Sequence, residues 1–268
     1  MISSTVLGNL KKVGFTNVKA YDKKGVIASV VDGDSLYIKV GKHPYKSIPL
    51  DFNATGYVND VAVSLHGLIA VAYTRGIEVY DVDFNLINKH VIESPSDDQF
   101  YYKKVEWVYD VLIAAHIIDD VRGLLVSLQV DRGVFVDLGA YISSVDGDGL
   151  GADMKFHMDS EVLYVGAPLT DTPTGLVCKT SAGGRVHAFS VVDGKFKYED
   201  YYIDAPTPTS GGMFGRDIRL CPEGILIEGY SNGYSSLKGQ LRVNNRYKSY
   251  RDDDGRPVLE LLKSFNEK

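Results

Sequence analysis

Three aspartates share one position in a recurring pattern of the sequence. Asp60, Asp153 and Asp217 each stand three residues after a Tyr, Leu or Phe, in YVND, LGAD and FGRD. Carboxylates that converge on one point repel each other, which raises at least one pKa or attracts a cation or a polar ligand. A suitably separated pair is also the minimum for glycoside hydrolysis. The structural alternative is that each aspartate accepts backbone N–H groups from a neighbouring element.

An acidic loop offers a second set of candidate ligands. Residues 144–149 contain Asp146 and Asp148, with Asp153 close behind. Calcium takes six to eight oxygen ligands, so these carboxylates would need backbone carbonyls to complete a site. The simpler interpretation is a solvated loop. The six histidines form no HxH or HExxH pair, and the sequence predicts no cofactor.

A serine in GYSNG, residues 229–233, matches the Gly-x-Ser-x-Gly pattern of serine hydrolases. In those enzymes a strained turn between a strand and a helix exposes the nucleophile. Here no helical pattern follows the serine. We therefore interpret the stretch as a glycine-rich connection between strands.

Tyrosine is abundant, with 18 residues, and it occurs in clusters. Tyrosine suits surfaces that are both apolar and hydrogen-bonding, such as protein and sugar interfaces, but it is also a good strand residue. Both interpretations stay open for six of these residues. They are Tyr101, Tyr102, Tyr201, Tyr202, Tyr230 and Tyr234.

The elements that would position these residues are short strands. Apolar residues alternate with period two between Gly, Asp and Asn turns, which indicates an all-β fold. The unit that carries the aspartates recurs five times, with starts at Phe15, Tyr57, Tyr102, Leu150 and Phe214. Each start is followed by a more apolar second run, a third run and a more polar fourth run.

Four strands in each unit, repeated every 40–50 residues or so, are typical of propeller blades. The sequence therefore predicts one domain, a five-bladed β-propeller of four-stranded antiparallel blades. The blades would span residues 15–56, 57–101, 102–149, 150–213 and 214–268, and residues 1–14 are a candidate closure segment. The last run, from Pro257 to Phe265, is either the closing strand or a short helix. In such a ring the first strand of each blade lines the central channel, so Asp60, Asp153 and Asp217 are the channel-lining candidates.

Residues 150–243 resemble FG-GAP repeats, the units of integrin alpha-subunit propellers. Phe214 and Gly215 stand where that family has its FG, and Leu150 and Gly151 replace it in the preceding unit. VGAP at residues 165–168 is similar to the GAP element. Many members bind calcium between the first two strands, but the turns HMDSE and CPEG found here have too few oxygen ligands.

Composition limits the partners. A net charge of −6 provides no broad positive field for a phosphate backbone, so nucleic acid is not an expected partner. No run reaches the ~20 apolar residues of a membrane span, and the N-terminus lacks a signal-peptide pattern. Two cysteines are too few for a disulfide framework. These features predict folding in a cytoplasm and no membrane insertion.

Three functions are compatible with these observations. We favour a non-enzymatic interaction module that docks to other proteins, since FG-GAP-like propellers usually work outside cells while this chain looks cytoplasmic. A phage or virus particle reconciles the two, as a tail, fibre or capsid decoration component. The alternatives are a lectin-like propeller that binds cell-surface glycan and a glycoside hydrolase that uses the channel carboxylates. Fold alone does not choose between them.

Overall fold

The structure of the chain, a computed structural model, is described over part of the sequence. The described residues are 19–21, 27–32, 35–40, 46–49, 58–91, 100–118, 122–131, 134–144, 147–173, 179–180, 182–222, 224–230 and 242–266.

The regular elements within these ranges are β-strands, and most of them form five four-stranded antiparallel sheets. The first sheet contains β1 (Lys19–Tyr21), β2 (Ile27–Asp32), β3 (Ser35–Val40) and β4 (Lys46–Pro49). The second contains β5 (Val58–Val63), β6 (Ile69–Tyr73), β7 (Gly76–Tyr80) and β8 (Leu86–Val91). The third contains β9 (Phe100–Val108), β10 (Val111–Ile118), β11 (Arg122–Asp131) and β12 (Val134–Ile142).

The last two sheets repeat this plan with one insertion. The fourth sheet contains β13 (Met154–His157), β14 (Val162–Ala167), β17 (Arg185–Val192) and β18 (Lys195–Asp204). Between β14 and β17 the chain forms a separate two-stranded sheet of β15 (Thr172–Pro173) and β16 (Lys179–Thr180), which lengthens this repeat. The fifth sheet contains β19 (Asp217–Cys221), β20 (Gly224–Tyr230), β21 (Arg242–Arg251) and β22 (Pro257–Asn266).

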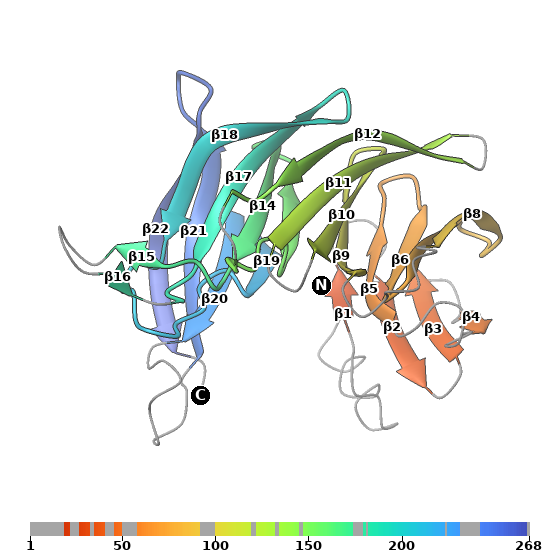
Figure 1. The fold of residues 1–268 in the computed structure, drawn as a ribbon, viewed down its shortest axis with the longest axis horizontal. Coiled ribbons are helices and arrows are strands. Elements are labelled where there is room, and N and C mark those ends of the chain that lie inside the picture. The colour runs from red at the N-terminus through yellow and green to blue at the C-terminus, as the bar shows by residue number, and fades with distance from the viewer. Residues whose placement is uncertain are drawn as a thin grey trace.

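The five sheets follow one another in an arc, with the first and the fifth at its two ends (Figure 1). The first strands of neighbouring sheets lie side by side on the inner side of the arc, where β5 contacts β9, β9 contacts β13 and β13 contacts β19. The fourth strands lie on the outer side, where β8 contacts β12, β12 contacts β18 and β18 contacts β22. The repeat therefore places equivalent residues of successive sheets next to each other.

The hydrophobic core lies between the sheets. One cluster of buried apolar residues fills each of the four junctions, for example Ile48 with Ile69 between the first and second sheets and Phe189 with Ile113 between the third and fourth. Strands β6 and β14 are buried along their whole length, which explains their continuous apolar sequence. The second, third and fourth sheets each have a neighbour on both faces, so stacking of repeats is what buries the core.

Two glycines allow the fourth and fifth sheets to touch through their backbones. A side chain on Gly166 in β14 would place its Cβ 1.8 Å from the carbonyl oxygen of Gly215. Gly215 itself has a φ of +89°, in the left-handed region that favours glycine. These are the glycines of the GAP-like and FG-like elements, so the two motifs meet across one junction between sheets.

The predicted fold class, all-β with four-stranded antiparallel sheets, is confirmed. The segment from Pro257 to Phe265 lies in strand β22, so the helical alternative for it is wrong. The candidate closure segment of residues 1–14 and the unit starts Phe15 and Tyr57 lie outside the described residues.

Within the described ranges, no helix has the length and the apolar character that crossing a membrane requires.

Candidate functional site

The inner strands carry a line of charged side chains that runs through the second, third and fourth sheets. Asp60 in β5 and Asp153 just before β13 are both buried, with 2% and 4% of their surfaces exposed. The backbone N–H of Val105 donates to Asp60 Oδ2 at 3.3 Å, and that of Ile218 donates to Asp153 Oδ2 at 2.7 Å. In both cases the donor belongs to the first strand of the following sheet. These two aspartates therefore join each sheet to the next, as the structural alternative expected.

Two ion pairs also join the third and fourth sheets, between β9 and the start of β13. Lys104 Nζ lies 3.0 Å from Asp153 Oδ1, and Lys155 Nζ lies 2.9 Å from Glu106 Oε2. The order of charges is Lys-x-Glu in β9 and Asp-x-Lys around the start of β13, so that opposite charges face each other in register. All four side chains are less than one-fifth exposed. Such pairs are costly to break, because a buried charge then loses its nearest counter-charge.

These surroundings shift the carboxyl groups in opposite directions. Burial opposes ionisation of Asp153, but Lys155, Lys104 and the Ile218 N–H outweigh it and hold the pKa of Asp153 below its usual value. Burial raises the pKa of Glu106, with a contribution from Asp60 and Asp153, although Lys155 opposes this. Burial therefore makes Glu106 easier to protonate than an ordinary glutamate. Sequence reasoning missed it, although the reversal of charge order between adjacent repeats is a signal that could have found it.

Asp217 occupies the equivalent position in the fifth sheet but makes different contacts. Arg219 Nη2 lies 2.5 Å from Asp217 Oδ2 and also 3.2 Å from the carboxylate of Glu228. Burial raises the pKa of Glu228, as does Asp217, while nearby arginines oppose the shift. The side chain of Asp217 is about one-third exposed. Within the described part of the chain, it therefore belongs to a charged face of the last sheet.

The acidic loop is held by its own hydrogen bonds. Asp148 is buried, and its carboxylate accepts from the Ser143 hydroxyl and from the Leu150 N–H, the latter at 2.9 Å. Asp146 lies outside the described residues. Among the residues that are described, no group of three or more His, Cys, Asp or Glu side chains is arranged to hold a metal ion. Asp148 thus fixes the loop that leads into the fourth sheet.

The candidate interface tyrosines divide into three groups. The hydroxyl of Tyr201 accepts the Leu259 N–H at 2.9 Å and so links β18 to β22. Tyr202 is 45% exposed beneath the Arg185 guanidinium, and Tyr230 is partly buried beneath that of Arg216. Tyr101 and Tyr102 lie in β9, and their side chains are outside the described part. Tyr234 and Ser231 lie outside the described residues altogether.

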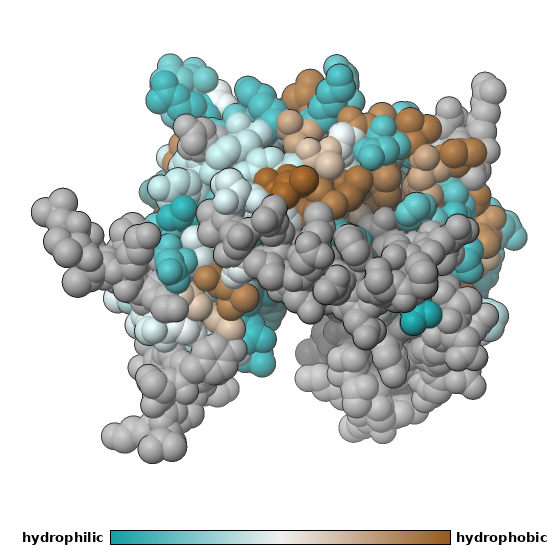
Figure 2. Space-filling model, viewed as in Figure 1, coloured by the Kyte–Doolittle hydropathy of each residue, from teal (hydrophilic) through white to brown (hydrophobic). Residues whose placement is uncertain are grey.

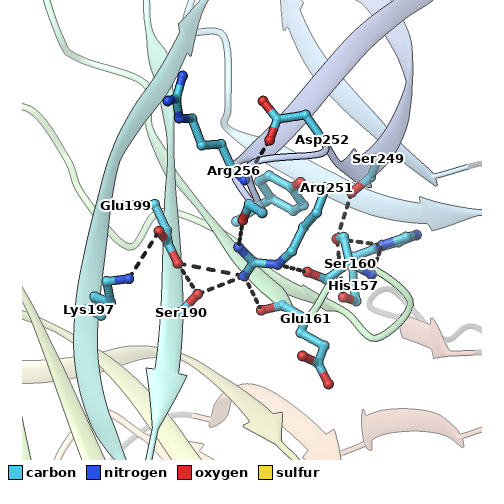
Figure 3. Close-up of polar contacts among 12 residues, drawn as sticks. His157, Ser160, Glu161, Ser190, Lys197, Glu199, Ser249, Arg251, Asp252 and Arg256 are labelled. Carbon is cyan, nitrogen blue, oxygen red and sulfur yellow. Dashed lines mark hydrogen bonds and ion pairs between the residues drawn. The ribbon is translucent and has the colours of Figure 1, made fainter.

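A second polar cluster joins the fourth and fifth sheets around Arg251 of β21 (Figure 3). Its guanidinium donates to the Ser160 carbonyl oxygen and to Ser190 Oγ, both at 2.8 Å, and lies 3.6 Å from Glu199. Ser160 Oγ lies 2.9 Å from His157 Nδ1, which is within reach for a nucleophile and its base. Ser160 is only 1% exposed, however, so a substrate cannot reach it. The cluster is a structural contact between sheets.

The pKa shifts of His116, which is buried, and of His187, which is partly buried, predict how stability depends on pH. Burial, with a smaller effect of His90, lowers the pKa of His116 from 6.5 to about 4, and His187 is shifted similarly by burial and Arg185. The unfolded chain therefore takes up these protons at a higher pH than the folded one, and the free energy of unfolding falls as the pH drops from 6.5 to 4. We expect His116 to account for about 2 kcal/mol, less than the full shift implies because water partly screens the ring.

Urea denaturation of the wild type and of His116→Gln between pH 7 and pH 4 checks this prediction. The variant should lose less stability over that range than the wild type. His66→Gln is the matched control, because the His66 side chain is 71% exposed. Parallel curves for the wild type and His116→Gln would contradict the prediction.

The sequence matches no protein-family model, and no curated protein matches it. Solved structures show the fold. A putative 6-phosphogluconolactonase from Bacteroides fragilis, which is a propeller, superposes with a TM-score of 0.55 at 17% identity, over 93% of this chain and 70% of that one. The present fold is a β-propeller. A europium-containing methanol dehydrogenase superposes with a TM-score of 0.50 at 11% identity. The match covers 91% of this chain and 50% of the dehydrogenase.

At these identities the likeness to solved propellers extends to the fold alone. The FG-GAP resemblance of residues 150–243 remains a prediction.

Proposed function

We propose that the chain is a five-bladed propeller that docks to other proteins through its outer strands and is not an enzyme. The observation that carries the proposal is the outer edge of the fifth sheet. Strand β22 is the last strand of its sheet, and from Glu260 to Asn266 its residues are exposed. Three of them are large and apolar, with 43%, 45% and 40% of their surfaces exposed: Leu261, Leu262 and Phe265.

Such an edge is suited to a protein partner. An edge strand offers a row of N–H and C=O groups to which another chain can add a strand, and alternate side chains then fill the partner's pockets. Proteins usually protect long edges with charges, prolines or bulges. Strand β22 has such features in Pro257, Glu260, Lys263 and a bulge in its pairing with β21, but large apolar side chains remain exposed between them. We therefore assign this edge to a partner that adds a β-strand or covers the strand with an apolar surface.

The third sheet presents a second apolar edge. Val134 and Val136 on the outer strand β12 are 62% and 42% exposed, and Ile142 at its end is 54% exposed. Figure 2 shows hydrophobic residues gathered over β11 and β12 on this side of the molecule. Apolar patches on a surface are typical of sites of protein contact.

The number of blades and the absence of catalysis rest on two further observations. Five described sheets in chain order support a ring of five blades. On the inner strands, Asp60 and Asp153 are occupied by bonds to the next sheet. These two candidates for a sugar-cleaving site thus have a structural role that accounts for their burial.

As the setting of this docking function we propose a phage or virus particle. The support is the resemblance to FG-GAP propellers, which usually work outside cells, in a chain that lacks a disulfide framework. Mass spectrometry of purified particles tests the setting separately from the docking surface. If such particles lack the protein, the proposed setting is wrong.

A photo-crosslinking amino acid placed at residue 262 tests the docking surface in the native assembly. We expect a crosslink to one defined protein, and we expect Leu262→Lys to abolish association with that protein while the melting temperature stays within a few degrees, since the side chain is exposed. The matched control is Leu65, which is 51% exposed in a loop of the second sheet. Equal crosslinking from residues 65 and 262 would contradict docking through β22.

A further inference from the structure

A cavity of about 290 Å³ lies where the first and second sheets meet. Its apolar lining includes Ile48 of β4, Tyr73 of β6 and Phe84 of the turn between β7 and β8. Its polar lining includes Glu78 of β7 and Lys89 of β8. Aromatic and aliphatic walls with a few converging polar groups are characteristic of small-molecule sites.

The polar groups form one hydrogen-bonded cluster around Glu78. Lys89 Nζ lies 2.8 Å from Glu78 Oε1, and the Tyr80 hydroxyl donates to Oε2 at 2.5 Å. The Tyr73 hydroxyl also bonds to this carboxylate. The Glu78 side chain is only 10% exposed. Burial opposes its ionisation, but the bonds from Lys89 and the tyrosines outweigh burial and lower the pKa of Glu78, which keeps it a carboxylate.

This cluster lies within one sheet, unlike the ion pairs of the inner strands. Tyr73, Glu78, Tyr80 and Lys89 all belong to the second sheet, whereas Asp153 with Lys104 bridges two sheets. Desolvating an ion pair is expensive. Glu78 and Lys89 face each other across β7 and β8, and because both line the cavity the pair offers an acceptor and a donor to whatever the cavity holds.

Phe84 is kept in the cavity wall against its backbone preference. Its φ is +67°, in the left-handed region where a bulky residue is a rare outlier. Asp81 holds this turn by accepting the N–H groups of Asp83 and Asn85 at 2.8 and 2.9 Å. Glycine or asparagine would fit the position without strain. The ring packs against the core of this junction, and strained residues of this kind cluster at binding sites, which favours a role of the ring in binding.

The charges around the cavity balance. Glu78 pairs with Lys89. Lys46 lies over the Phe84 ring, with Nζ 5.1 Å from the ring centroid. It donates to the Asp83 carbonyl oxygen at 2.9 Å, and its Nζ lies 3.9 Å from the Asp83 carboxylate. A charged ligand would enter a half-buried site that offers it no spare counter-charge. A neutral ligand with several hydroxyl groups can donate to Glu78 and accept from Lys89 at once.

We propose that this cavity binds one neutral sugar ring, with Glu78 and Lys89 bonded to adjacent hydroxyl groups and the Phe84 ring packed against the apolar face of the sugar. The volume lies at the lower end of the range for ligand pockets and fits a single sugar residue. The sugar is either a free monosaccharide or the terminal residue of a glycan, since both present the same ring. The site is separate from β22 and does not depend on docking through that strand.

Isothermal titration of the full chain with glucose, galactose, mannose and N-acetylglucosamine tests the proposal, with glucuronate as the charged counterpart of glucose. We expect saturable binding of at least one neutral sugar and weaker binding of glucuronate. An array of immobilised glycans that end in the same sugars separates the two sources. If the chain binds the array, the ligand is the terminal residue of a glycan. If it binds the free sugar but not the array, the ligand is a monosaccharide.

Two variants connect binding to the cavity. Phe84→Gly removes the ring and the strain together, so we expect at least tenfold weaker binding with an unchanged or higher melting temperature. Glu78→Gln keeps the shape and should also weaken binding tenfold or more. The matched control is Asp193→Gly, at an exposed hairpin residue of the fourth sheet with a φ of +50°. The proposal is overturned if no neutral sugar binds, if glucuronate binds as well as glucose, or if both cavity variants bind as the wild type does.

Discussion

Replacement of Asp153 by alanine is expected to lower the free energy of unfolding by about 3–5 kcal/mol. The carboxylate is 6% exposed and lies 3.0 Å from Lys104 Nζ, while its other oxygen accepts the Ile218 N–H at 2.7 Å. The variant removes the carboxylate that Lys104 and the Ile218 N–H contact across the junctions on either side of the fourth sheet. Urea denaturation at pH 7 measures the loss.

The variant Asp153→Asn separates the two contributions. An asparagine side chain still has an oxygen to accept the Ile218 N–H but no charge for Lys104. We therefore expect it to cost less than alanine, and we expect the double variant with Lys104→Met to recover part of the loss, because the two residues are coupled.

The control for this series is Asp217→Asn, at the equivalent position of the fifth sheet. There the ion pair with Arg219 is about one-third to one-half exposed, and exposed pairs contribute only about 0–1 kcal/mol. If Asp153→Asn left stability unchanged and instead abolished a sugar-cleaving activity, the carboxylate would be catalytic and the docking proposal would be wrong.

The strands and their grouping into sheets could be predicted from the sequence, because both follow from patterns among residues that are close together in the chain. A strand buried on both faces, such as β14, must be apolar throughout, and a hairpin needs turn residues at its end. The helical alternative for residues 257–265 arose because Leu259, Leu262 and Phe265 also fit helical spacing. Pairing with β21 decides for a strand, and local spacing contains no information about that partner.

The contacts of charged residues were less accessible, because they depend on how one repeat is aligned in space with the next. Alignment of the units identified Asp60, Asp153 and Asp217 as equivalent. It did not show that the first two bond to the following sheet, or that Lys104 and Glu106 face Asp153 and Lys155. The cavity proposed to bind a sugar could not be predicted from the sequence for a similar reason. It depends on the left-handed backbone conformation of Phe84, which no turn rule predicts.

Substitution of Gly166 by alanine is expected to lower the free energy of unfolding by about 3 kcal/mol or more, at the upper end of the effects of overpacking. The new Cβ would lie 1.8 Å from the carbonyl oxygen of Gly215, a backbone atom that cannot turn away as a side chain does. Gly166 is also tied in place, since its N–H donates to the Asp153 carbonyl oxygen and its own oxygen accepts the Gly151 N–H, both at 2.9 Å. The fifth sheet must therefore move away from the fourth. Hydrogen exchange should show early loss of protection at Ile218, whose N–H bonds to Asp153 across the same junction.

The control that isolates close packing from backbone preference is Gly255→Ala. Gly255 has a φ of +75° but nothing within 4 Å of its Cβ position, so alanine there should cost only about 1–2 kcal/mol for the left-handed conformation. Equal effects at residues 166 and 255 would mean that the fourth and fifth sheets separate easily and that the glycines are not required for their contact. A much larger effect at residue 166 would show why both motifs contain glycine: each sheet leaves out a side chain where the backbone of its neighbour must lie.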